Sequence, residues 1–107
     1  VSAYRDFVRR REEDLAAVLA AFPRARVVPN GSGHYRTIIT GIRMPDDRHV
    51  VEMVARIRER TGFLFYPGTV TGFPREFGLS FRVNLLQDRV NVREGLASVL
   101  SALEDER

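Results

Sequence analysis

Residues 62–103 constrain the fold of this 107-residue chain more than any other segment. They contain two short apolar runs, at 63–66 and 78–85, separated by a loop rich in glycine and proline. Such runs are typical of strands, and a continuous apolar run predicts a central strand at 63–66. Apolar residues then recur at helical spacing, namely Leu96, Val99, Leu100 and Leu103. The segment therefore predicts strand, loop, strand and helix.

The N-terminal part predicts four more elements. In order, they are a helix over 4–22, a strand over 26–29, a strand over 35–42 and a helix that opens at 45–47. Ser2 is the expected N-cap of the first helix and Pro23 its end, while Gly62 closes the second helix. Asn91 with Glu94 predicts a capping box for the last helix. The order α-β-β-α-β-β-α predicts a single α+β domain over 1–107, a small sheet with helices packed against it.

The composition excludes several kinds of chemistry. Without cysteine there are no disulfides and no zinc–thiolate sites, and two histidines fifteen positions apart predict no metal site. No apolar run approaches the about 20 residues of a membrane helix, so we expect no membrane partner. The absence of cysteine favours a cytoplasmic protein. The net charge is +3, but arginines alternate with Asp and Glu, as in RRREED at 9–14. That mixture favours solvated helix faces over a nucleic-acid partner.

Arg82 is the strongest candidate for a binding residue. It lies inside an apolar strand, between Phe81 and Val83. A guanidinium is a planar fork that matches a carboxylate and stays charged in any environment. Spacing alone leaves two other interpretations open: an arginine on the solvent face of an edge strand, or one paired with Glu76 or Asp88.

Three local patterns follow one another along the chain. The first is the helix over 4–22, which has a face rich in arginine and aspartate. The second is PNGSGHY at 29–35, followed by β-branched residues. The third is FYPG at 65–68, then Gly78, then FRVNL at 81–85 before the last helix. Together they resemble the small, C-terminal domain of fold-type-I enzymes that use pyridoxal 5'-phosphate (PLP), the aspartate aminotransferase family. The likeness covers the whole chain in the order of its elements.

The resemblance implies an aminotransferase that moves an amino group between an amino acid and a 2-oxo acid. Arg82 would bind the substrate carboxylate, and Tyr35, His34, Pro67 and Gly68 would lie beside the substrate. His34 departs from the pattern, since many members carry a small or aromatic residue there. The resemblance further implies that this domain closes over the site, and that the enzyme is a homodimer whose large domain binds PLP.

The chain contains no lysine, because all 17 of its Lys and Arg residues are arginines. It therefore cannot form the Schiff base that PLP enzymes need, and the resemblance implies that the catalytic residues lie in the large domain and not in this chain. We expect it to be the C-terminal domain of a longer polypeptide, and its start at Val1 rather than Met favours the same interpretation.

Other functions stay open. A different PLP reaction, such as decarboxylation or acyl condensation, would use the same small domain. From a different class, the chain could be a stand-alone module that binds a small ligand or RNA, and RNA binding would need exposed aromatic residues on a sheet beside basic ones. Phe63, Phe65 and Phe81 could serve, but their apolar neighbours favour burial. Tyr66 could hydrogen-bond a ligand phosphate or hydroxyl group, but we expect it in the core as well. A purely structural or dimerisation domain has no positive support in the sequence.

Overall fold

The computed structural model describes residues 3–28, 33–63, 65–68 and 75–106. The expected N-cap Ser2, most of the turn before Tyr35, Leu64 and most of the loop after Gly68 lie outside these residues. The elements are α1 (Ala3–Leu19), β1 (Arg26–Val27), β2 (Tyr35–Ile39), α2 (Asp47–Thr61), β3 (Tyr66–Pro67), a 3-10 turn (Arg75–Phe77), β4 (Ser80–Asn84), a π-helical turn (Asn91–Gly95) and α3 (Leu96–Asp105). This order confirms the predicted α+β class.

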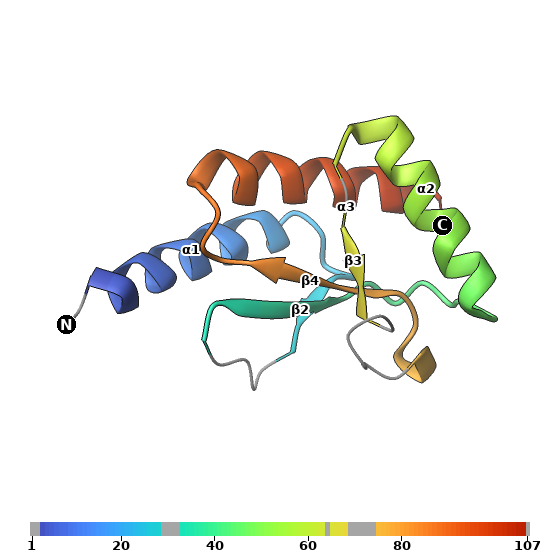
Figure 1. Ribbon diagram of the computed structural model, residues 1–107, viewed down its shortest axis with the longest axis horizontal. Helices are drawn as coiled ribbons and strands as arrows, with labels where there is room; N and C mark the ends of the chain where they lie inside the picture. Colours follow the sequence, from blue (N-terminus) through green and yellow to red (C-terminus); the bar gives the residue numbers. More distant parts are fainter. Residues whose placement is uncertain (1–2, 29–32, 64, 69–74, 107) are drawn as a thin grey trace.

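The four strands form one antiparallel sheet in the order β1-β2-β4-β3. β4 is therefore central, with β2 on one side and β3 on the other (Figure 1). The prediction that 63–66 forms a central strand was wrong, because β3 consists of Tyr66 and Pro67 among the described residues and lies at the end of the strand order. The strand expected over 35–42 ends at Ile39, shortly before Gly41 takes a left-handed backbone with φ 77°.

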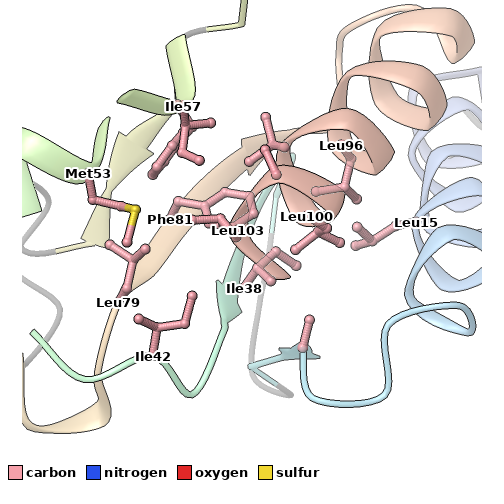
Figure 2. Packing of buried hydrophobic residues seen from close by; sticks show 14 of the residues in the cluster. Leu15, Ile38, Ile42, Met53, Ile57, Leu79, Phe81, Leu96, Leu100 and Leu103 are labelled. Atoms are coloured by element: carbon pink, nitrogen blue, oxygen red, sulfur yellow. The ribbon is translucent and has the colours of Figure 1, made fainter. Parts of the chain in front are cut away.

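Among the described residues, the α-helices gather on one side of this sheet and leave the other side uncovered (Figure 1). Ile38 of β2 lies opposite Phe81 of β4, and the two side chains are only 0% and 2% exposed. Both belong to the hydrophobic core with Leu100 and Leu103 of α3 (Figure 2). Because side chains alternate along a strand, Phe81 in the core places Arg82 on the opposite face. We call this uncovered side the open face.

Local capping explains where two of the helices begin. At α2, Asp46 Oδ1 accepts a hydrogen bond from the His49 backbone N–H at 2.9 Å, and Gly62 ends the helix with φ 79°, as predicted. The last helix lacks the predicted capping box. Instead, Asp88 Oδ1 accepts from the Asn91 backbone N–H at 2.8 Å, so the helix begins before Asn91.

A buried carboxylate ties α1 to the start of the last helix. Asp14 is 5% exposed, and its Oδ1 lies 2.7 Å from Nε of Arg93 and 3.3 Å from Nε of Arg89. Its Oδ2 lies 3.3 Å from Nε of Arg11, without the alignment of a hydrogen bond. The arginines supply the positive charge that a buried carboxylate requires.

Candidate carboxylate-binding site

Arg82 lies in the middle of the open face, on the central strand β4. Its cross-strand neighbours are Thr37 of β2 and Tyr66 of β3. Directly paired residues of an antiparallel sheet point to the same face, so all three side chains lie on the open face. Arg82 is exposed, although it belongs to a central strand. The interpretation of Arg82 as part of an edge strand was therefore wrong.

Tyr35 holds the Arg82 side chain from the neighbouring strand. The guanidinium carbon of Arg82 lies 4.1 Å from the centre of the Tyr35 ring, which is a cation–π contact. Tyr35 pairs with Asn84, two residues along β4 from Arg82, so the contact runs diagonally across the two strands. Such diagonal neighbours are within reach of aromatic and long side chains.

The guanidinium of Arg82 has no acidic partner in the described part of the chain. No hydrogen bond or ion pair joins it to a described residue, and that includes Glu76 and Asp88. The carboxylate of Asp88 instead caps the last helix through the Asn91 backbone N–H. Arg82 thus keeps its donors for an external anion, because its contact with Tyr35 occupies none of them.

Sequence reasoning favoured the core for Tyr66 over a contact with a ligand. The prediction that it belongs to the core was wrong, since Tyr66 is 58% exposed and lies directly opposite Arg82. Its neighbour Phe65, by contrast, is 5% exposed and packs 5.2 Å from the Phe81 ring. Alternation along the strand predicts that Phe65 and Tyr66 point to opposite faces of the sheet. Which of the two faces the core depends on the pairing with β4, and this register could not be read from the sequence.

The other predicted site residues lie around Arg82 at different depths. His34 packs against Tyr35, with ring centres 4.4 Å apart and ring planes tilted by 41°, and its Nδ1 lies 3.2 Å from the hydroxyl oxygen of Tyr4 in α1. It is therefore held at the edge of the site. Pro67 pairs with Phe81 on the helix side of the sheet and is buried, as is Gly68. The structure brings Tyr35 to Arg82 but turns Pro67 away from it.

A cavity of about 380 Å³ opens beside Arg82. Tyr35, Tyr66 and Asn84 of the sheet are among its walls, together with residues of the last helix. Deeper walls come from Phe65, Val92, Leu96 and Val99, all buried. Among the described lining residues, one cation therefore lies beside buried apolar walls, which is a common arrangement in sites for small molecules.

No described helix has both the length and the apolar composition that crossing a membrane requires. Within the described residues, His, Asp and Glu nowhere form a group of three that could hold a metal ion. A scan against protein-family models found no match to the chain, and a search of curated proteins found no relative.

Proposed function

We propose that this chain is the small domain of a fold-type-I PLP-dependent aminotransferase, and that Arg82 binds the carboxylate of its amino acid and 2-oxo acid substrates. The observation that carries the proposal is the guanidinium of Arg82, which has no anionic partner among the described residues and stacks on Tyr35. A cation fixed in direction and open to solvent suits the recognition of a carboxylate.

Two further features support the proposal. The order of helices and strands is the one that the resemblance to this family implies, and Arg82 faces the side of the sheet that the helices leave open (Figure 1). A large domain could approach this open face, so that closure of the two domains would bury the substrate and exclude water. Arg82 would then orient the substrate by its carboxylate end.

This chain lacks the lysine that would hold PLP. The sequence has no lysine to hold the cofactor covalently, so the residues that bind PLP would have to lie in another part of the enzyme. When bound, PLP supplies the electron sink for the reaction. The part assigned to this domain is limited to binding and orienting the substrate and to covering it.

Replacement of Arg82 in the native enzyme tests the proposal. For Arg82→Ala we expect KM for the amino acid to rise about 10-fold to 100-fold, because a charge-assisted hydrogen bond is lost, while the PLP content stays unchanged. Arg82→Lys keeps the charge but loses the planar guanidinium, so its KM should lie between those of the original enzyme and Arg82→Ala. Arg26→Ala is the matched control, since Arg26 is an exposed arginine of the same sheet. Unchanged kinetics in Arg82→Ala would remove Arg82 from the site.

One observation favours a second candidate, the binding of single-stranded RNA. Tyr35 and Tyr66 are 40% and 58% exposed and lie beside Arg82 on the open face, where bases could stack. Phe65 and Phe81, by contrast, are buried. Fluorescence anisotropy with a labelled oligouridylate of about ten nucleotides tests this candidate. Binding that is lost in both Tyr35→Ala and Tyr66→Ala would favour RNA over a carboxylate ligand.

A further inference from the structure

The charges around the cavity beside Arg82 limit the ligands that it can take. Among the described lining residues Arg82 is the only cation, and none is Asp or Glu. The other polar side chains near its mouth are the amides Asn84, Gln87 and Asn91 and the tyrosine hydroxyls. A ligand with one carboxylate finds its partner in Arg82. A second carboxylate inside the cavity would lose its hydration without gaining a cation, which is costly.

The deeper walls of the cavity are apolar, and one of them contains a glycine where an alanine would fit the backbone. Gly95 lies in the last helix and is buried, with a helical φ of −62°. A glycine inside a helix costs about 1 kcal/mol relative to alanine, so its presence calls for a steric reason. A Cβ at this position would lie 3.2 Å from the Phe63 ring. The missing methyl group thus lets Phe63 pack close to the helix, in the wall of the cavity.

We propose that the substrates are amino acids and 2-oxo acids with a single carboxylate and a large apolar side chain. The carboxylate binds Arg82 at the mouth, and the side chain enters the cavity among Phe63, Phe65, Val92, Leu96 and Val99. This inference rests on the proposed function, because it takes Arg82 as the carboxylate group's partner. It goes further in predicting that dicarboxylic ligands bind this domain less tightly than ligands with one carboxylate and an apolar side chain.

Binding to the 107-residue chain tests the inference, since the structure gives this chain a hydrophobic core of its own. The probes are phenylpyruvate, pyruvate and 2-oxoglutarate, titrated at millimolar concentrations into ¹⁵N-labelled protein and followed by amide chemical shifts. We expect phenylpyruvate to bind about tenfold or more tightly than the other two, because its ring is removed from water. The shifts should fall on Phe65, Arg82, Val92 and Gly95. Equal affinities, or shifts located elsewhere, would overturn the inference.

Two variants separate this inference from the proposed function. Arg82→Gln should weaken all three ligands, because each depends on its carboxylate. Gly95→Ala should weaken phenylpyruvate several-fold and leave pyruvate unchanged, because the new methyl group would lie 3.2 Å from the Phe63 ring and force this part of the cavity wall to shift. Ser101→Ala, at an exposed position of the same helix, is the matched control.

The outcomes then differ for the two claims. If the three ligands bind equally and Arg82→Gln weakens them all, the carboxylate role of Arg82 stands and the apolar substrate class is wrong. If phenylpyruvate binding is unaffected by Arg82→Gln, the proposed function fails, and the inference that rests on it fails as well.

Discussion

The guanidinium carbon of Arg82 lies 4.1 Å from the centre of the Tyr35 ring, across the two middle strands of the sheet. This contact restricts a long side chain that would otherwise sample many rotamers on the open face. Side-chain ordering costs free energy on binding, and an arginine that is already held loses less. Tyr35 is therefore a positioning residue for Arg82.

Replacing Tyr35 should weaken carboxylate binding without removing it. For Tyr35→Leu we expect the Kd for phenylpyruvate to rise about two- to five-fold, the size of an exposed cation–π contact. Tyr35→Phe keeps the ring and should restore the affinity, which separates stacking from any role of the hydroxyl group. An equal loss of affinity in both variants would mean that the hydroxyl group, and not the stacking, matters.

The buried Asp14 should contribute strongly to stability. Asp14→Asn removes the charge that faces Arg93, Arg89 and Arg11, so we expect the free energy of unfolding to fall by about 1–3 kcal/mol. Urea denaturation followed by circular dichroism measures the change. The control is Asp6→Asn, because the Asp6 side chain is 42% exposed and lies 3.9 Å from Arg9. This exposed pair should be worth less than about 0.5 kcal/mol, so equal losses in the two variants would contradict the assignment.

Two glycines with left-handed backbones should differ in their tolerance of alanine. Gly78 has φ 82°, and a Cβ there would lie 2.7 Å from the backbone oxygen of Ile42. Gly62 has φ 79°, but a Cβ there would meet open space. Gly62→Ala should cost about 1 kcal/mol of unfolding free energy from backbone strain alone, and Gly78→Ala clearly more. Urea denaturation of both variants measures the two losses of unfolding free energy. Equal losses would show that small shifts of the structure relieve the contact with Ile42.

The N-cap of α2 should make stability depend on acid pH. The pKa of Asp46 is lowered from its usual 3.8, first of all by the hydrogen bond with the His49 side chain and then by the His49 backbone N–H. A pKa below the unfolded value means that the folded state binds this proton less readily. The stabilisation is therefore complete above the unfolded pKa and is lost as the pH falls through the lower, folded pKa.

Asp46→Asn tests this dependence, because asparagine also caps helices but does not titrate near pH 4. The difference in unfolding free energy between the original chain and the variant should shrink as the pH is lowered from about 6 to about 3. A difference that stays constant over this range would show that Asp46 does not contribute through its charge.

Local patterns predicted the elements of this fold better than their pairing. The start of α2 at Asp46 and its end at Gly62 follow from the chemistry of a few adjacent residues. The edge position of β3 and the exposure of Tyr66 depend on which strand pairs with which, and in what register. A short apolar run does not show which distant strand it pairs with, or in which register.

The candidate site was predicted in the same uneven way. Arg82 could be singled out from its place in an apolar strand, but its stacking on Tyr35 could not, because that contact joins β2 and β4 diagonally. The start of the last helix was also predicted only in part. Asn91 and Glu94 match a local capping pattern, but the helix begins before Asn91 and Asp88 provides the cap.

The most direct test of the proposed function is the absorption spectrum of the native protein, purified at its natural length, before and after treatment with borohydride. We predict a visible absorption band of bound PLP that borohydride bleaches, in a polypeptide much longer than 107 residues. A colourless protein of about this length would contradict the assignment of this chain to a PLP-dependent aminotransferase.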